Sequence, residues 1–397
     1  MNILYISYNG ATEPLFQSQG IPYIEGASNQ GSNFLLLTFE KKCNLKSNNP
    51  IFIRIKNRLS ENKIRWIFLK FHKRPIIFSK PYDLLQGIVV SCFLVFKFKI
   101  DIIQARGLFS ALIALPVCFV RRKILIFDIR SKLYEAYAIS GKWKKNGFMF
   151  KLVEALEKIC ISYARAVVVE TNTHKKEIDE FVTKKKLNKI TEDIPCCVDL
   201  SRFQNIKFDE VDESKFLISY VGSLSGWYCF KETINFLKSA CKILSFSQLV
   251  ILTKDNPEFI FQYAKQNLLY TDSIKVYNAD PEELPYYLAN SHAGIVFRQP
   301  YTRLSSFPVK IGEYLAAGIP VILNKGMGDV EKFILDNGVG VVVNDFNDDD
   351  FTQAFFKLLA LKKDKNIRQR CLAAAKLLSV ENGTKKYVNL YNKLSPL

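Results

Sequence analysis

Short apolar runs that alternate with helical stretches occur in two series along the chain. Runs of this kind are typical of parallel strands buried on both faces of a sheet. A polar, charged stretch at residues 204–215 separates the two series and predicts a linker. We expect strands at residues 3–8, 34–39, 102–105, 124–129 and 167–170, and then at 216–221, 249–253, 274–277, 294–297, 321–324 and 341–343. The alternation predicts two α/β domains, each a doubly wound parallel sheet, and 397 residues suffice for two cores.

The segment SSFPVKIGEYLAAGIPV, at residues 305–321, predicts a short helix with two charged side chains on one face. Ser305 and Ser306 suit the N-cap, and the glycine and proline near the end of the segment are stop signals. Lys310 and Glu313 are three residues apart and therefore share a face. The unpaired amides at such a helix start attract phosphate, and a neighbouring carboxylate can bind a sugar diol. The pattern suits a nucleotide-sugar site, although an exposed Lys–Glu ion pair also fits the spacing.

Five stretches, in the expected order along the chain, are similar to bacterial family 4 glycosyltransferases that build surface polysaccharides. They are PVKIGEYLAAGIPV with the following Asn324 and GMGDVE, the opening MNILYISYNGATEPLFQSQGIPYIEG, FDIRSKLYEAYAISG at 127–141, IPCCVDLSRF at 194–203 and YVGSLSGWYCFKE at 220–232. The resemblance implies the GT-B fold. In that fold two Rossmann-like parallel-sheet domains face each other across a cleft, and a C-terminal helix returns to the first domain.

The resemblance also implies a domain plan and an activity. We predict an N-terminal acceptor domain at residues 1–203, a linker at 204–215, a C-terminal nucleotide-sugar donor domain at 216–375, and a terminal helical segment at 376–397 that packs on the first domain. The implied activity is transfer of a sugar from a nucleoside diphosphate to an acceptor hydroxyl, with retention of anomeric configuration. The expected acceptor is a lipid-linked oligosaccharide of lipopolysaccharide or capsule synthesis.

Ligands of doubly wound sheets bind beyond the carboxyl ends of the strands, so the loops that follow strands supply the candidate residues. Gly222 and Ser223 follow the first strand of the second series, where backbone amides can approach a diphosphate. Arg298 follows another strand and can clamp phosphate oxygens, or can form a surface salt bridge. The predicted donor site comprises Gly222, Ser223, Arg298, Ser305, Ser306, Phe307, Lys310 and Glu313.

Residues that follow strands of the first series are the candidates on the acceptor side. Asp128 can orient or deprotonate the acceptor hydroxyl as a general base, or it can hold Arg130 in a structural pair. The other acceptor-side candidates are Asn9, Gly10, Gln17, Arg130, Lys132 and Glu135. We predict that the catalytic residues are Asp128, Arg298, Lys310 and Glu313, with positive charge and helix amides stabilising the leaving diphosphate.

Three positions depart from the family that the chain resembles. Ser305 stands where many members have the first of two glutamates, which leaves recognition of the sugar hydroxyls to the second. Ser223 stands where an arginine is common, so Arg298 and Lys310 are expected to replace its charge. Phe16 occupies a position where glycine is usual, which hinders close approach of the backbone to the donor.

The net charge of +18 is concentrated in the first half of the chain, because residues 1–200 contain 32 Lys or Arg and 17 Asp or Glu. Such asymmetry indicates an anionic partner. Basic and apolar residues alternate at residues 51–74, which is typical of a surface apposed to a membrane but also fits a solvated strand and loop. We expect an anionic membrane surface as partner and no nucleic acid, since no basic recognition helix or zinc finger is evident.

No stretch of the sequence is long and apolar enough to span a membrane, and the apolar residues 84–96 predict a buried helix. Without a secretory signal, we expect a cytoplasmic protein, peripheral on the inner face of the cell membrane. The nine cysteines lack CxxC spacing and are expected in the cores. The three histidines lack metal-ligand spacing and the acidic run 348–350 suits a helix start, so we predict no metal and no cofactor besides the sugar nucleotide.

Three other functions fit parts of the sequence: a GT-B sugar-nucleotide epimerase, a nicotinamide-dependent Rossmann enzyme, and a catalytically silent relative that acts as an assembly partner. The absence of GxGxxG after the first strand disfavours the nicotinamide enzyme. An epimerase would release a changed sugar nucleotide without an acceptor, whereas a silent partner would bind a transferase without turnover.

Overall fold

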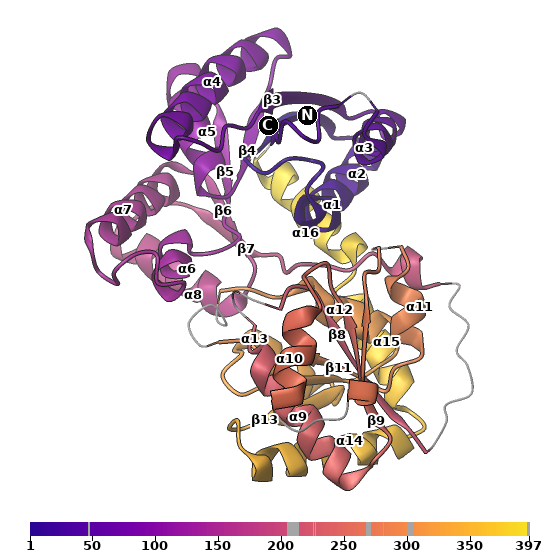
Figure 1. Ribbon diagram of the computed structural model, residues 1–397. Coiled ribbons are helices and arrows are strands. Elements are labelled where there is room, and N and C mark those ends of the chain that lie inside the picture. Colours follow the sequence, from indigo (N-terminus) through magenta and orange to yellow (C-terminus); the bar gives the residue numbers. More distant parts are fainter. Residues whose placement is uncertain are drawn as a thin grey trace. The chain divides into compact units, whose positions relative to one another are not determined.

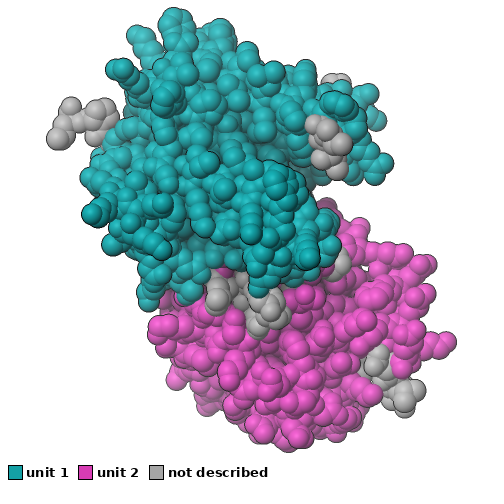
Figure 2. Space-filling view, turned by 90° about the vertical axis from the view of Figure 1, so that its left-hand side faces the viewer, with its two compact units in different colours: residues 1–196, 380–397 teal, residues 197–379 magenta. Residues whose placement is uncertain are grey.

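The computed structural model describes residues 1–46, 48–204, 214–224, 226, 228–266, 271–280, 282–299 and 305–394. The chain forms two compact units, one of residues 1–196 with 380–397 and the other of residues 197–379 (Figures 1 and 2). Each unit contains one parallel sheet with its own helices, so the prediction of two doubly wound α/β domains is confirmed.

The sheet of the first unit has seven parallel strands in the order β3-β2-β1-β4-β5-β6-β7. They are β1 (Asn2–Ser7), β2 (Asn33–Glu40), β3 (Arg65–Lys70), β4 (Ile102–Arg106), β5 (Ile124–Asp128), β6 (Ala166–Val169) and β7 (Ile190–Asp193). The helices of this unit are α1 (Pro14–Gln19), α2 (Ile21–Asn29), α3 (Pro50–Glu61), α4 (Ile76–Lys97), α5 (Leu108–Arg121), α6 (Leu133–Ile139), α7 (Phe148–Tyr163), α8 (Asn172–Lys184) and α16 (Val380–Leu394). The strand order reverses between β1 and β4, which is the switch point at which such sheets bind ligands.

The sheet of the second unit has six parallel strands in the order β10-β9-β8-β11-β12-β13. They are β8 (Phe216–Val221), β9 (Ser247–Leu252), β10 (Ile274–Tyr277), β11 (Ala293–Val296), β12 (Val321–Asn324) and β13 (Gly340–Val343). Its helices are α9 (Phe230–Ile243), α10 (Glu258–Gln266), α11 (Leu284–Ala289), α12 (Val309–Ala316), α13 (Asp329–Asp336), α14 (Asp348–Lys363) and α15 (Ile367–Leu377), with the short 3-10 helices η1 (Leu200–Phe203) and η2 (Thr271–Ser273). The acidic run 348–350 begins α14 as predicted, and Asn347 caps that helix by accepting from the Asp350 amide.

The boundaries between the two units along the sequence lie close to the predicted ones but differ from them by several residues. The division falls after residues 196 and 379, rather than after 203 and 375. Val198 explains the shift, because it bridges to Ser379 and its amide donates to the Leu378 carbonyl at 2.8 Å, which ties residues near 198 to the second unit. Most of the predicted linker, residues 205–213, lies outside the described residues.

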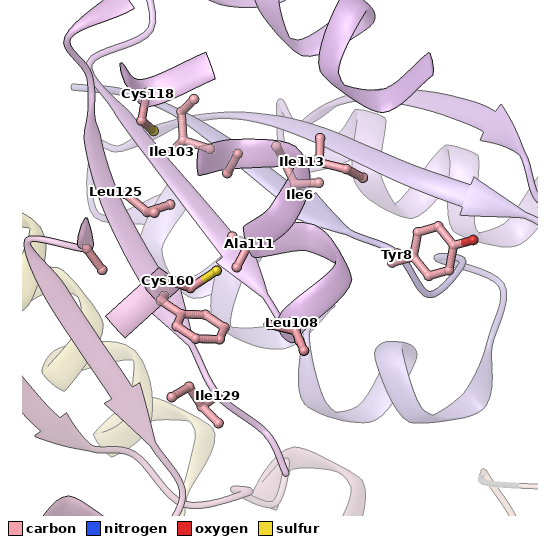
Figure 3. Close-up of a cluster of buried hydrophobic side chains, with 14 of the residues drawn as sticks. Ile6, Tyr8, Ile103, Leu108, Ala111, Ile113, Cys118, Leu125, Ile129 and Cys160 are labelled. Carbon is pink, nitrogen blue, oxygen red and sulfur yellow. The ribbon is translucent and has the colours of Figure 1, made fainter. Parts of the chain in front are cut away.

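The core of the first unit consists of apolar side chains from its strands and mainly from α4, α5 and α7, with a few from α6 and α8. Figure 3 shows Ile6 and Ile103 on the strands, with Ile113 and Cys118 on α5 beside them. Burial raises the pKa of the Cys118 thiol to about 12, so this cysteine is an unreactive core residue, as expected. Cys43 is an exception, because it is exposed.

All of the predicted strands are present, within two residues of the expected ends. The edge strands β3 and β7 were missed because their residues are partly exposed and form no apolar run. Residues 51–74, for which a strand and loop was one alternative, instead contain most of α3 before β3. The helix forms there because Asn49 accepts hydrogen bonds from the amides of Ile51 and Phe52.

None of the described helices has the length and apolar character needed to cross a bilayer. Residues 84–96 lie within α4, but the prediction that they are buried is wrong for one face of the helix. Leu85, Val89, Phe93 and Phe96 are each more than half exposed.

Candidate functional site

Helix α12 in the second unit contains the two charged residues that the sequence placed on one face. The helix begins at Val309, after Pro308, so the prediction that Ser305 and Ser306 form its N-cap is wrong. Pro308 has an extended backbone and no side-chain cap, and the hydroxyl of Ser306 instead accepts a hydrogen bond of 2.7 Å from the Arg298 guanidinium. The segment before the helix therefore connects α12 to the loop after β11.

Lys310 is buried against the carboxyl end of β8. Only 6% of its surface is exposed, and its ammonium group donates to the Val221 carbonyl. The nitrogen also lies 3.7 Å from the centre of the Tyr228 ring, a cation–π contact. Burial lowers the pKa of Lys310, and the neighbouring Tyr228 partly opposes that shift. Gly222 leaves the space that this requires, because it has φ +112° and a Cβ there would lie 3.0 Å from the lysine nitrogen.

Arg298 follows β11 and is also buried, with 5% of its surface exposed, so the alternative of a surface salt bridge is wrong. Asn324, at the end of β12, fixes its backbone: the Arg298 amide donates to the Asn324 side chain at 2.9 Å, and the Asn324 amide group donates back to the Arg298 carbonyl at 3.0 Å. The guanidinium carbon lies 5.9 Å from the Tyr228 ring centre. Arg298 and Lys310 thus share one aromatic neighbour at the carboxyl edge of the sheet.

Glu313 lies on α12 one turn beyond Lys310 and is 6% exposed. Its carboxylate accepts a hydrogen bond of 3.2 Å from the guanidinium of Arg202, so the alternative of an exposed Lys310–Glu313 pair is wrong. Burial raises the pKa of Glu313, while Arg202 and then Lys310 act in the opposite direction. The sequence analysis did not single out Arg202, although it lies within the IPCCVDLSRF stretch.

The remaining donor-site candidates have partners in the second unit. The Ser223 hydroxyl donates to the Asp255 carboxylate at 2.8 Å, and the Leu224 amide donates to the same oxygen at 2.7 Å. A diphosphate at this loop would therefore approach an acidic side chain. Phe307 is buried against Phe333, with ring centres 5.8 Å apart, and Ser305 is buried as well. Lys310, Arg298 and Glu313 form a cluster with the unpredicted Tyr228 and Arg202. We call these five residues the donor cluster.

In the first unit, Asp128 at the end of β5 is 0% exposed. Its carboxylate contacts Arg130 at 2.8 and 3.0 Å, and the Tyr387 hydroxyl from α16 donates to it at 2.9 Å. Arg106 lies 3.9 Å away. Arg130 also donates to the Tyr387 hydroxyl. These contacts favour the structural alternative for Asp128 and Arg130, and the general-base role remains a prediction that this burial disfavours.

Lys132 and Glu135 lie apart from that network, 3.6 Å from each other at the start of α6, and Lys132 also pairs with Glu177. Burial raises the pKa of Glu135. The neighbouring Glu157 of α7 is 4% exposed, and burial raises the pKa of its carboxyl group to about 8. The sequence analysis did not identify this buried carboxyl group.

Glu157 gives the first unit a pH-dependent stability. In the folded chain the carboxyl group keeps its proton up to about pH 8, whereas it loses it near pH 4.5 when unfolded, so stability falls as the pH rises through this window. Glu157→Gln is expected to remove that fall and to raise the midpoint of urea unfolding at pH 8. Unfolding curves at pH 5 and pH 8 measure the effect, and an equal pH dependence in the variant would contradict it.

The loop after β1 holds the other acceptor-side candidates. Asn9 is exposed and Gly10 is buried. Glu40, at the end of β2, fills the loop. Its carboxylate accepts a hydrogen bond of 2.6 Å from the Thr12 hydroxyl, and a Cβ on Gly10 would lie 2.4 Å from a carboxylate oxygen. Glycine at position 10 therefore allows the backbone to lie close to this buried carboxylate. The Gln17 side chain donates to the Thr12 carbonyl at 2.8 Å.

Phe16, which replaces the usual glycine, is 1% exposed. Its ring packs against Gly20, where a Cβ would lie 2.4 Å from the ring. The bulky side chain thus lies in the interior of the unit and is accommodated by a second glycine.

A second polar network at the carboxyl edge of the first sheet was not predicted. Asp83 is fully buried and lies 2.6 Å from the ring nitrogen Nδ1 of His72, which follows β3. The Tyr8 hydroxyl, after β1, donates to Asp83 at 2.8 Å, and Lys80 donates to that hydroxyl at 3.0 Å. A carboxylate fixes the orientation of this imidazole, and no pattern in the sequence brings the four residues together.

The comparisons with known proteins agree with this architecture. Residues 201–377, which make up most of the second unit, match the family described as glycosyl transferases group 1. No curated protein sequence matches the chain significantly. Among solved structures, sucrose-phosphate synthase from Thermosynechococcus elongatus is 15% identical with a TM-score of 0.72, and 99% of each chain is covered.

Two further structures are similar over nearly their whole length. HepE from Anabaena in complex with UDP is 12% identical with a TM-score of 0.71, covering 99% of this chain and 100% of the other. The lipopolysaccharide outer core galactosyltransferase WaaB is 15% identical with a TM-score of 0.66, covering 99% and 100%. These similarities establish the GT-B fold.

Proposed function

We propose that this glycosyltransferase moves a sugar from a nucleoside diphosphate to a hydroxyl group of a lipid-linked oligosaccharide in surface polysaccharide synthesis, with retention of configuration. The donor cluster is the observation that carries the proposal. It includes two buried cations, Lys310 and Arg298, and the buried carboxylate of Glu313, which lie at a strand end and on a helix of the glycosyltransferase domain. The resemblance to family 4 enzymes, and the WaaB structure, support a polysaccharide product.

Each residue of the cluster has a role in the proposed transfer. As the bond between the sugar and the diphosphate breaks, negative charge grows on the leaving oxygen, and Lys310 and Arg298 stabilise it electrostatically. Glu313, held by Arg202, accepts hydrogen bonds from hydroxyls of the donor sugar. Because the two cations supply the positive charge, we propose that the transfer needs no metal ion.

The proposed donor base follows from a structural relative. HepE is described in complex with UDP and with UDP-glucose, so UDP is the first nucleotide to test here. The acceptor is proposed to be membrane-linked, with the protein peripheral on the inner face of the membrane. The basic first half of the chain supports this placement.

Thermal unfolding with added nucleotides tests the proposed donor site. A ligand that binds only the folded protein stabilises it by about 2.7 kcal/mol at 100 times its dissociation constant. We expect one nucleoside diphosphate among UDP, GDP, ADP and dTDP to raise the melting temperature, with no effect from CMP or NAD. The variant Lys310→Met removes a cation of the donor cluster and should lose this rise in melting temperature.

Three results would count against the proposal. No shift with any nucleotide in well-folded protein would favour the silent assembly partner. A selective shift with NAD would favour the nicotinamide enzyme. A shift with one sugar nucleotide, followed by its conversion to another without an acceptor, would favour the epimerase.

A further inference from the structure

Helix α4 of the first unit carries an apolar stripe on its outer face. Its members, Phe78, Tyr82, Leu85, Val89, Phe93 and Phe96, are between 54% and 73% exposed. They are spaced by four or three residues, so they form one line along a helix of 3.6 residues per turn. We call these six residues the α4 stripe. An exposed apolar patch of this length is unusual on a protein that stays in water and marks a surface of interaction.

The rest of α4 is fixed against the body of the unit. The helix packs on α5, and a Cβ at Gly87 would lie 2.8 Å from the Ile113 side chain. Leu94 and Val95, on the inner side, belong to the core. The stripe therefore cannot turn inward without breaking the packing between α4 and α5, and it faces outward as a rigid surface.

The stretch of sequence that contains the stripe is strongly basic. Residues 63–123 contain 12 Lys or Arg, and their only acidic residues are Asp83 and Asp101. Asp83 is fully buried, and Asp101 accepts a hydrogen bond of 2.9 Å from the Asn2 amide. Two of the cations touch the stripe: the Lys97 nitrogen lies 5.4 Å from the Phe93 ring centre, and the Arg121 guanidinium lies 5.7 Å from that of Phe96.

A basic pocket lies at the end of α5, the neighbouring helix. It has a volume of about 400 Å³ and is lined by Arg122, Lys123, Arg165 and Lys393, with Tyr163. Among the described residues that line it there is no carboxylate, although Lys393 pairs with Glu192 at 3.1 Å. The ring of Tyr163 lies 6.3 Å from that of the exposed Phe119 on α5. Exposed apolar surface and a pocket suited to a phosphate group therefore adjoin each other.

We infer that the α4 stripe docks on a bilayer containing anionic phospholipids, with the surrounding cations and the basic pocket bound to lipid phosphates. The inference refines the membrane association proposed above by naming the surface. Aromatic and aliphatic side chains flanked by Lys and Arg are the composition of helices that lie in a membrane interface. A second copy of the chain is disfavoured, since it would bring the same positive charges face to face.

Sedimentation of the full-length protein with vesicles tests the inference. Wild-type protein should bind vesicles containing phosphatidylglycerol and remain unbound with phosphatidylcholine alone. The variant Phe93→Glu/Phe96→Glu should lose at least about tenfold in binding, because it removes buried apolar area and adds repulsive charge. The matched control is Phe246→Glu/Phe356→Glu, which changes two exposed phenylalanines of the second unit and should bind as the wild type does.

Three results would overturn the inference: equal vesicle binding by the two double variants, equal binding of the wild type to both kinds of vesicle, or a wild-type dimer that the stripe variant converts to a monomer without any vesicle binding. Nucleotide-induced thermal shifts are measured on the same variants. Because they report on the second unit, an intact shift with lost vesicle binding separates this inference from the proposed sugar transfer.

Discussion

Replacing Glu313 with glutamine is expected to lower kcat/KM for sugar transfer by about 100-fold or more, while the fold stays intact. Glutamine has the same shape and keeps one oxygen that can accept from Arg202. It loses the negative charge that strengthens hydrogen bonds to the donor sugar. Initial rates with a nucleotide sugar and a membrane-derived acceptor measure the effect, and circular dichroism with the melting temperature reports the fold.

Arg202→Met separates a direct role of Glu313 from a structural one. If Glu313 binds the sugar itself, the arginine variant keeps part of the activity because the carboxylate remains. An equal loss in the two variants would show that the pair acts only as a unit that supports α12. Unchanged kinetics in Glu313→Gln would remove this residue from the donor site.

Asp128→Asn is expected to destabilise the first unit by about 3 kcal/mol, because it removes the closest counter-charge of two buried arginines and leaves only Glu170, 3.8 Å from Arg130. Asp128 is fully enclosed, with Arg130 at 2.8 Å and Arg106 at 3.9 Å. Hydrogen exchange is the suitable measurement, since a chain with two units need not unfold in one step. Amides of β5 and α16 should lose protection, and those of the second unit should not.

Asp336→Asn is the matched control, because it removes a carboxylate from an exposed pair with Lys332 on α13. Such pairs contribute between about 0 and 1 kcal/mol, so the exchange pattern should hardly change. If Asp128→Asn left protection unchanged but abolished transfer, the structural assignment would be wrong and the general-base prediction would be restored.

Much of the fold could be predicted from the sequence because buried parallel strands are apolar along their whole length. That rule located strands such as β8 and β12, whose side chains are buried on both faces of the sheet. It failed for β3, an edge strand with an exposed and half-buried pattern, and for the outer face of α4. The sequence of an apolar helix predicts that the helix is buried. Which of its faces is covered depends on the elements that pack against it in the folded protein.

The candidate site was predicted less completely, because spacing shows which residues share a helix face but not what they touch. Lys310 and Glu313 share the face of α12, yet each pairs with a residue far away in sequence. Tyr228 and Arg202 could not be found this way, since they reach the cluster through tertiary folding alone. The prediction that serines cap α12 failed because the backbone is extended at Pro308, directly before the helix.

The return of α16 to the first unit has a consequence for the synthesis of the protein. The ribosome makes β1 to β7 early, but Tyr387, which donates to Asp128, and Tyr391, which donates to Gln104, emerge only after the whole second unit. Until α16 emerges, the Gln104 side-chain oxygen lacks its donor and Asp128 lacks one of its partners, while the second unit can already fold. A chain released before α16 is complete would have a folded second unit and an incompletely folded first unit. Cellular proteases would cleave the first unit preferentially.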